Sequence, residues 1–391
     1  MQIAWQATAL TYTTKILQSS LLSLTLLAAT AAHSQEWLYT VRPGDNIWNV
    51  SATYLIRLDY WPRLQALNGV ADPERLPPGL KLRIPIAWLK RLPAKAQVLS
   101  AQGQATAMIA ATGQTVPVAS GQLLQTGDTL LTGPDSAVSL EFGDGSRVLL
   151  QADSELRLEA LNAYGPTRFV NTRIRLQQGR LESQVAPRTS SGPRYEISTP
   201  AAVSTVRGTR YRISMDSKAV TARTEVVKGV VAFQGGQTTR TVKRGFGTLA
   251  ETGQAPLPPL RLLPPPKVAE LPPVVMRLPV QIGFFPLRGA VAYRAQIVPV
   301  DPSRTLLLDT VLPALSADNP NGSRSGSRAA PEALTLLLSP VGSKMPAGDY
   351  VARIRGIDDN GLEGYDAQYR FHFQALPGQD SAEDENRDTD Q

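Results

Sequence analysis

The sequence predicts a multidomain, mainly β protein, and three observations lead to this prediction. The chain has 391 residues, more than one hydrophobic core usually accommodates. It contains 31 prolines, 30 glycines and 42% hydrophobic residues, a composition typical of a turn-rich globular chain. From residue 97 onward, short runs of alternating apolar and polar residues are separated by glycine turns, and no long helical period interrupts them.

Residues 1–34 are expected to form a signal peptide. Lys15 precedes an apolar stretch over residues 16–32, and the small-residue pattern before a cleavage site gives a mature chain that begins at Gln35. The stretch is short and polar compared with the roughly 20 apolar residues of a membrane span. An uncleaved leader that anchors the chain is the alternative. We therefore expect export to the periplasm, with association to the cell wall and no membrane span after leader removal.

Residue usage excludes several kinds of site. The chain has no cysteine, so a disulfide framework and a thiolate metal site are excluded. His33 is expected to leave with the leader, and His372 alone cannot build a multi-histidine metal centre. A glycosidase needs two carboxylates that flank the cut, whereas the acids here are scattered over hairpins and caps. We expect no enzyme activity, no catalytic residue, no metal and no cofactor.

The charge distribution favours an anionic partner. The formal net charge is +7 although the tail, residues 376–391, is acidic and is expected to be disordered. The remaining body is therefore more basic than the total, which favours anionic envelope polymers. An exported protein rarely meets nucleic acid, so no nucleic-acid partner is expected.

Residues 35–90 predict a small β-α-α-β unit, and about fifty residues are too few for a deep pocket. The strand pattern at Tyr39–Val41 stops at Pro43-Gly44, and apolar residues recur at helical spacing from Ile47 onward. Asp45 is placed to cap this helix. A compressed turn of this kind either only reverses the chain or presents main-chain groups to a ligand.

The second half of this unit predicts another short helix and a closing strand. Asp59 is a possible cap of the helix, and Asn68-Gly69 is expected to end it. After a turn at Pro78-Gly79, Leu82 and Ile84 alternate as a strand.

The segments YTVRPGDNIWNVSATYL, WPRLQALNG and DPERLPPGLKLRIP follow one another with a spacing that resembles the LysM domain. The resemblance implies two helices on one side of a two-stranded sheet. It also implies that peptidoglycan, an N-acetylglucosamine-containing glycan, lies between the loop after the first strand and the loop before the second. The contact residues it implies are Gly44, Asp45, Asn46, Ile47, Asn68, Gly69, Val70 and Leu76.

The chemistry of an N-acetyl group suits two facing loops. The group offers one amide donor and one carbonyl acceptor, which main-chain groups can match, and Ile47 or Leu76 can cover its methyl group. Asn46 stands where the family usually has Thr. The alternative is that Gly44 and Asp45 only turn the chain and cap the helix. Trp48 and Trp61, at helical positions, are expected in the core rather than stacked on a sugar.

Residues 97–250 predict an all-β unit, closed or sandwich-like. Asp144-Gly145 lies between AVSLEF and SRVLLQ and predicts a hairpin. The segments GDTLLTGPDSAVSLEFGDGSRVLL, IRLQQGRLESQV and TPAAVSTVRGTRYRI resemble the FecR domain. The residues of the last motif are expected to be structural, with Arg207 satisfying strand carbonyls rather than gripping an anion; they are Thr199, Pro200, Val206, Arg207, Gly208 and Thr209.

The FecR resemblance implies a periplasmic domain that, in signal transducers, relays an iron-siderophore signal to a cytoplasmic sigma factor. A transducer carries a cytoplasmic segment and a spanning helix before this domain. Here a leader and a glycan-binding module stand in that place, so direct sigma-factor regulation is not expected.

The remainder predicts a linker and a further β domain. Residues 251–274 form a proline-rich linker, with eight prolines in the twenty positions 255–274, and are expected to run as a stiff spacer. Residues 275–375, above all AGDYVARIRGIDDNGLEGYDAQYRF, resemble a fibronectin type III or related immunoglobulin-like sandwich. The whole chain is expected to be a non-catalytic envelope adaptor that binds peptidoglycan and an envelope protein partner. The alternative is a periplasmic signalling or sensor component.

Overall fold

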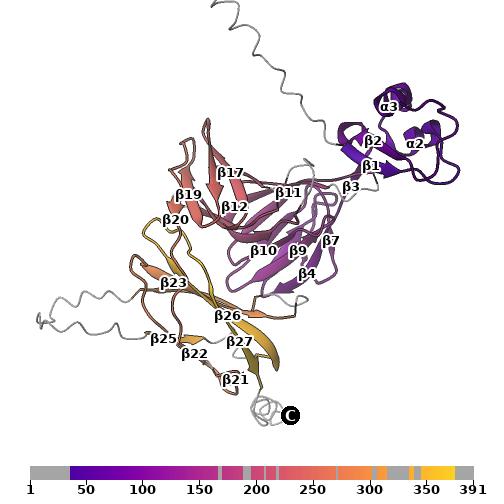
Figure 1. The fold of residues 1–391 in the computed structure, drawn as a ribbon. Coiled ribbons are helices and arrows are strands. Elements are labelled where there is room, and N and C mark those ends of the chain that lie inside the picture. Colours follow the sequence, from indigo (N-terminus) through magenta and orange to yellow (C-terminus); the bar gives the residue numbers. More distant parts are fainter. Residues whose placement is uncertain are drawn as a thin grey trace, which may run out of the picture.

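The computed structural model describes residues 36–165, 170–187, 195–206, 208–216, 220–269, 272–301, 306–314, 334–338 and 345–374. The expected signal peptide and the acidic tail lie outside these ranges. Strands make up 54% of the structure and helices 8%, which confirms the mainly β class (Figure 1). No helix in the described ranges is long and apolar enough to cross a membrane.

The amino-terminal unit, residues 36–90, has the predicted β-α-α-β order. It consists of β1 (Glu36–Thr40), α2 (Ile47–Tyr54), a short 3-10 turn (Leu58–Tyr60), α3 (Trp61–Asn68) and β2 (Lys81–Pro85), followed by a second 3-10 turn (Ile86–Trp88). The two strands pair antiparallel, with Tyr39 opposite Leu82. Buried side chains from both helices pack on the sheet, among them Ile47 and Leu64.

Two predicted helix caps in this unit are wrong. Asn46 caps α2: its side chain accepts a hydrogen bond from the Asn49 main chain, and the Asn49 side chain accepts one from Asn46. Asp45 instead accepts hydrogen bonds from the Tyr39 hydroxyl and the Arg42 main chain, which hold its carboxylate within the turn.

At α3 the cap position is Tyr60, and Asp59 pairs with Arg57. The predicted end of α3 is confirmed, because Gly69 adopts a left-handed conformation there (φ 59°).

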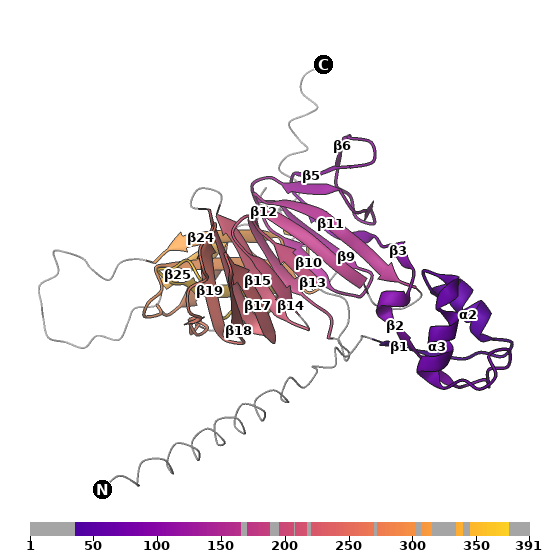
Figure 2. The same ribbon diagram turned by 90° about the horizontal axis from the view of Figure 1, so that it is seen from above.

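The central unit contains the strands from β3 to β20, which form a closed barrel of two facing sheets (Figure 2). Its strands are β3 (Arg91–Pro93), β4 (Ala96–Gln102), β5 (Ala105–Met108), β6 (Thr115–Pro117), β7 (Leu123–Leu124), β8 (Thr129–Thr132), β9 (Ala137–Phe142), β10 (Arg147–Leu150), β11 (Glu155–Tyr164), β12 (Val170–Gln184), β13 (Tyr195–Ser198), β14 (Val203–Val206), β15 (Arg210–Asp216), β16 (Thr221–Lys228), β17 (Val230–Gly235), β18 (Thr238–Lys243), β19 (Phe246–Glu251) and β20 (Leu260–Arg261).

The long strand β12 belongs to both sheets. Its first part pairs with β11 and β13, and its second part pairs with β10 and β15. The change occurs at Gly179, whose φ is 92°; a Cβ atom there would lie 2.5 Å from the Cα of Ser154. Only glycine fits this bend. The core between the sheets includes Leu140, Leu176, Tyr211 and Phe233.

The predicted hairpin at Asp144-Gly145 is confirmed. Strands β9 and β10 pair antiparallel on either side of it. Gly145 has a φ of 80°, and the Asp144 carboxylate accepts a hydrogen bond from the Ser146 main chain.

The C-terminal unit is a sandwich of a sheet ordered β21-β27-β26-β23-β24 and the pair β22-β25. Buried side chains lie between them, including Phe284, Tyr293 and Phe371. The strands are β21 (Val274–Val275), β22 (Val280–Phe284), β23 (Ala292–Pro299), β24 (Leu308–Pro313), β25 (Leu334–Leu338), β26 (Gly348–Ile357) and β27 (Ala367–Phe373).

The expectation that residues 251–274 run as a stiff spacer is wrong where the structure describes them. Within residues 251–274, Leu260 and Arg261 pair with β19 as strand β20. Leu262 is buried, and the main chain at Lys267 accepts a hydrogen bond from Phe285. Apolar residues between the prolines bury themselves against both β units, so the segment follows their surfaces.

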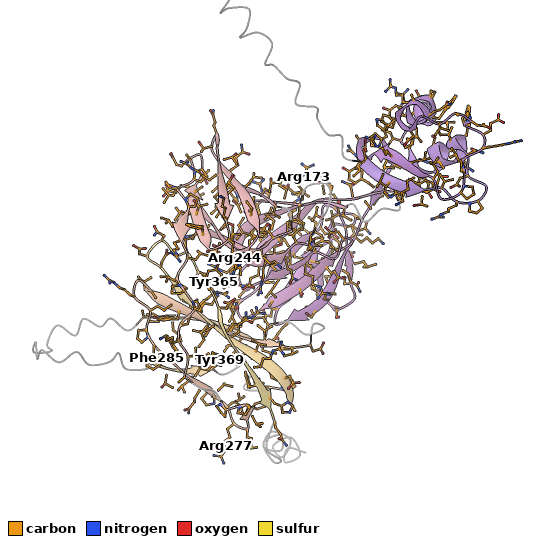
Figure 3. All side chains as sticks on the ribbon, viewed as in Figure 1. Arg173, Arg244, Arg277, Phe285, Tyr365 and Tyr369 are labelled. Carbon is orange, nitrogen blue, oxygen red and sulfur yellow. The ribbon has the colours of Figure 1, made fainter. Side chains whose placement is uncertain are left out.

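The central and C-terminal units meet through a buried network of charges. Glu363 pairs with Arg180 of the central unit (2.9 Å) and with Arg294 and Arg355 of its own unit (2.6 Å each). Asp366 pairs with Arg212 and Arg355 at 2.8 Å. Figure 3 labels Tyr365 and Arg244 at this junction, where side chains fill the space between the two units.

Candidate glycan-binding site

The two loops expected to hold a glycan lie side by side at one end of the amino-terminal unit. The Ile47 main-chain N–H donates to the carbonyl oxygen of Pro73 over 2.9 Å, and the Gly79 N–H donates to Val41 over 2.9 Å. These bonds connect the loop after β1 with the segment between α3 and β2, and they place Gly44 and Asp45 beside the residues that follow Gly69.

The conformation of the first loop depends on the positive φ of Gly44 and on the carboxylate of Asp45. Gly44 has a φ of 86° and is exposed, and a Cβ atom there would meet nothing within 4 Å. The backbone angle, not lack of space, therefore requires glycine. Asp45 accepts a hydrogen bond from the Tyr39 hydroxyl over 2.5 Å. Burial, and to a smaller extent this hydrogen bond, raises the pKa of Tyr39 above its ordinary range.

Several implied contact residues use their side chains within the fold. The Asn46 side chain caps α2, and the Ile47 side chain lies in the core with no exposed surface. Leu76 is also buried in the core. Neither Ile47 nor Leu76 therefore presents a side chain that can cover an acetyl methyl group.

Asn68 connects α3 to the outer edge of β2. Its Nδ2 donates to the carbonyl oxygens of Leu64 (2.9 Å) and Arg83 (3.0 Å), and its Oδ1 accepts from the Arg83 N–H (2.6 Å). Val70 is likewise engaged, because its N–H and its carbonyl group both bond to Gln65. Gly69 remains exposed at the surface.

The groups left for a ligand are therefore mainly main-chain groups. Among residues 36–90, the N–H groups of Gly44, Ala71 and Asp72 make no hydrogen bond, and all three residues are exposed. Sequence reasoning did not single out Ala71 and Asp72. Their position between the glycine end of α3 and Pro73 is the signal that could have found them.

A stacked aromatic pair with one exposed ring lies next to the first loop. The rings of Trp48 and Trp61 stack with centroids 4.7 Å apart, and Trp48 is 45% exposed. The expectation that Trp48 lies in the core is wrong, whereas Trp61 is half-buried and packs against the core. Since Trp48 directly follows Ile47, its ring lies at the loop end of α2.

The loop end faces away from the rest of the molecule. Helix α2 begins at the loops and ends at Tyr54, whose carbonyl oxygen accepts a hydrogen bond from the Lys90 N–H. Lys90 in turn accepts a bond from Gly165 of the central unit, and Arg91 lies over the ring of Tyr164. The attachment and the loops are thus at opposite ends of α2 (Figure 1).

The residues of the 199–209 motif lie on the central unit, far from these loops in the fold. The Thr199 hydroxyl and main chain bond to Ala202 next to Pro200, and the Thr209 hydroxyl donates to Val230. Val206 is buried, and Gly208 has a φ of 62°. Arg207 lies outside the described residues.

Within the described ranges, no group of three or more His, Asp or Glu side chains could hold a metal ion. His372 lies on β27 with its ring half exposed, and its Nδ1 is 2.8 Å from the Asp349 carboxylate. The expectation that His372 is an exposed strand residue is confirmed.

Comparison with known proteins identifies two parts of the chain. The family model described as LysM domain matches residues 39–85, and the model described as FecR protein matches residues 128–232. No curated protein matches the chain. Two crystal structures of a candidate anti-sigma factor from Parabacteroides distasonis ATCC 8503 align at 13% and 15% identity with a TM-score of 0.29 each.

Each alignment covers 34% of this chain and 59% of the other, so it spans less than two thirds of that protein. At this TM-score the alignments carry no argument about function. The two family models show that the chain contains a LysM domain and a FecR domain, which are typical of envelope or periplasmic proteins.

Proposed function

We propose that this protein is a non-catalytic envelope protein that binds peptidoglycan through its LysM domain. LysM domains bind peptidoglycan, and the observation that carries the proposal here is the bond between Ile47 and Pro73. It holds two exposed loops together with the unpaired N–H groups of Gly44, Ala71 and Asp72. Such donors suit the carbonyl oxygen of an N-acetyl group.

The structure of the loops refines the proposed site. Recognition uses the main chain of Gly44, Asp45 and the segment after Gly69, with the exposed ring of Trp48 as an apolar surface for a sugar. Asn46, Ile47, Asn68, Val70 and Leu76 shape these loops from within.

The FecR domain and the C-terminal sandwich then serve as an adaptor in the periplasm, presenting surfaces to an envelope protein partner. The buried charges between them make the two units one body to which the LysM domain is attached by β3. A body of this kind can hold a partner at a fixed place on the wall.

Sedimentation with purified peptidoglycan tests wall binding. We expect the chain from residue 35 to sediment with peptidoglycan, and Ala71→Trp to abolish this by filling the space between the loops. Ala87→Trp is the matched control, because Ala87 is also exposed but lies at the attached end of the unit. Failure of the unaltered chain to sediment, or equal sedimentation of both variants, would contradict the proposed site.

The match of residues 128–232 to FecR favours a second candidate, a periplasmic signalling component. Crosslinking in cells separates the two. A crosslink to an outer-membrane transporter or a signal transducer supports signalling, whereas crosslinks to wall-bound proteins support the adaptor.

A further inference from the structure

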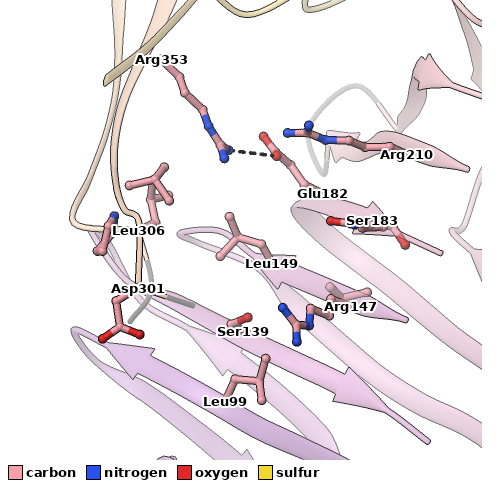
Figure 4. A pocket seen from close by; sticks show the side chains of 14 residues that line it. Leu99, Ser139, Arg147, Leu149, Glu182, Ser183, Arg210, Asp301, Leu306 and Arg353 are labelled. Carbon is pink, nitrogen blue, oxygen red and sulfur yellow. Dashed lines mark ion pairs between the residues drawn. The ribbon is translucent and has the colours of Figure 1, made fainter. Parts of the chain in front are cut away.

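A cavity of about 220 Å³ opens at the junction of the central and C-terminal units. It lies between β9, β10, β12 and β15 on one side and β23 and β26 on the other (Figure 4). This volume is below the roughly 300–1,000 Å³ of sites for drug-sized ligands. It suits a ligand about the size of one amino acid.

Positive charge is in excess around this cavity. The guanidinium groups of Arg147, Arg210 and Arg353 line it, and in Figure 4 the Glu182 carboxylate lies between the side chains of Arg210 and Arg353. Arg353 Nη1 is 3.7 Å from Glu182 Oε2, a long ion pair, and the Nε of Arg353 is buried without a hydrogen-bond partner.

The Glu182 carboxylate is paired mainly with arginines of the buried network. Its Oε1 lies 3.1 Å from Arg355 and 3.5 Å from Arg212, both of which belong to the buried network. One carboxylate is therefore shared among three guanidinium groups. Burial, which the carboxylates of Glu182 and Asp366 only partly offset, lowers the pKa of Arg353.

The other two arginines leave donors free. Arg210 is half-buried and lies near the Glu182 carboxylate, but it forms no ion pair with it or with another carboxylate in the described part of the chain. Arg147 pairs with Glu141 through its Nε alone, at the exposed surface. Asp301, the second carboxylate at the cavity, is exposed and already has a partner.

Apolar side chains complete the lining. Leu149 lies on the floor formed by β10, and Leu306 lies on the wall formed by the C-terminal unit. The cavity thus combines unpaired guanidinium donors with an apolar surface, and strands of both β units bound it.

We propose that this cavity binds the carboxylate of a small ligand, either an N-acylated amino acid or the C-terminal residue of a peptide. The carboxylate is bound by the free donors of Arg210 and Arg147, because a guanidinium group matches a carboxylate with two parallel hydrogen bonds. A small apolar side chain lies against Leu149 and Leu306. The assignment is independent of glycan binding by the LysM domain.

Isothermal titration calorimetry of the purified protein tests this site. We expect N-acetylalanine to bind and N-acetylalanine amide, which lacks the charge, not to bind. Arg210→Gln should weaken binding at least tenfold, and Arg240→Gln, an exposed arginine on β18, should leave it unchanged. Arg147→Gln, at the exposed rim, should weaken binding several-fold. This variant tests the site if Arg210→Gln does not fold.

Titration with trialanine distinguishes the two possible sources of the carboxylate, a peptide C-terminus and a free N-acylated amino acid. Tighter binding of trialanine than of N-acetylalanine identifies a peptide terminus, and weaker binding identifies a free small acid. Equal binding of the acid and its amide, unchanged binding in both arginine variants, or tighter binding of inorganic phosphate than of either carboxylate would each overturn the proposal.

Discussion

Arg355 Nε lies 2.6 Å from Glu363 Oε2, and both side chains are almost fully buried, with 1% and 0% of their surface exposed. The same guanidinium group contacts Asp366 at 2.8 Å and Glu182 of the central unit at 3.1 Å. Removing these charges from water costs free energy that their attraction only partly returns. We therefore expect the network to fix the relative position of the two units more than to add net stability.

Arg355→Met is expected to destabilise the protein strongly. The substitution leaves the carboxylates of Glu363, Asp366 and Glu182 buried with fewer positive partners, and breaking one side of a buried ion pair costs about 3–5 kcal/mol. Urea denaturation followed by circular dichroism measures this loss. Arg57→Gln, which removes an exposed pair with Asp59, serves as control and should leave the midpoint unchanged. Similar midpoints for both variants would contradict the role assigned to the network.

The stability of the protein should fall as pH rises towards 7 because of Glu225. Burial raises the pKa of this carboxyl from 4.5 to about 7, although Arg180 and Arg212 lie near it. Between these values the folded state keeps a proton that the unfolded chain has lost. The stabilising contribution is thus complete below pH 4.5 and is lost as pH rises through 7, by on the order of 3 kcal/mol.

Glu225→Gln should remove this slope, since glutamine keeps the shape of the neutral acid without titrating. Free energies of unfolding measured from pH 5 to pH 8 test the prediction. The neighbouring Glu363 has its pKa held well below the ordinary range by Arg180, Arg355 and Arg294 against the effect of burial, so its stabilising contribution is lost only in acid, below pH 4.5. An unchanged slope in the Gln variant would show that another group titrates.

Asn68→Ala should destabilise the LysM domain without removing a glycan contact. The side chain makes three hydrogen bonds to Leu64 and Arg83, and the loss leaves main-chain groups of α3 and β2 with fewer partners, at a cost of about 1–3 kcal/mol. Asn68→Asp retains the bond from the Arg83 N–H and should show an intermediate loss in a thermal melt. Folded protein of either variant should still sediment with peptidoglycan; loss of sedimentation by the folded variants would make Asn68 a direct contact.

Gly179→Ala should be the most damaging glycine substitution on the central unit. The added Cβ atom would lie 2.5 Å from the backbone of Ser154 at a φ of 92°, so both contact and backbone angle oppose it, by at least about 2 kcal/mol. Gly113→Ala is the matched control, because Gly113 also has a positive φ (69°) but has open space around it. Thermal melts of the two variants should differ by several degrees; equal melting temperatures would contradict the tight contact at Gly179.

The sequence by itself determined the features that depend on near neighbours in the chain. The β-α-α-β order, the glycine end of α3 at Gly69 and the hairpin at Asp144-Gly145 were predictable, because each follows from spacing and backbone preference over a few residues. The two loops of the proposed glycan site were predictable in the same way. The sequence did not predict which polar groups of these loops remain available to a ligand, since Asn68 contacts Arg83, fifteen residues away, only after folding.

Tertiary structure alone decided the interface between the FecR domain and the C-terminal unit. Glu182 and Arg212 alternate with core residues along their strands, so in sequence they resemble residues that face water. They become buried because a second sheet covers that face. Their partners, Arg355 for Glu182 and Asp366 for Arg212, come from the C-terminal unit more than a hundred residues later. Pairing over such a separation leaves no local pattern. The arginine-lined cavity at the same junction therefore became visible only when the two units were seen together.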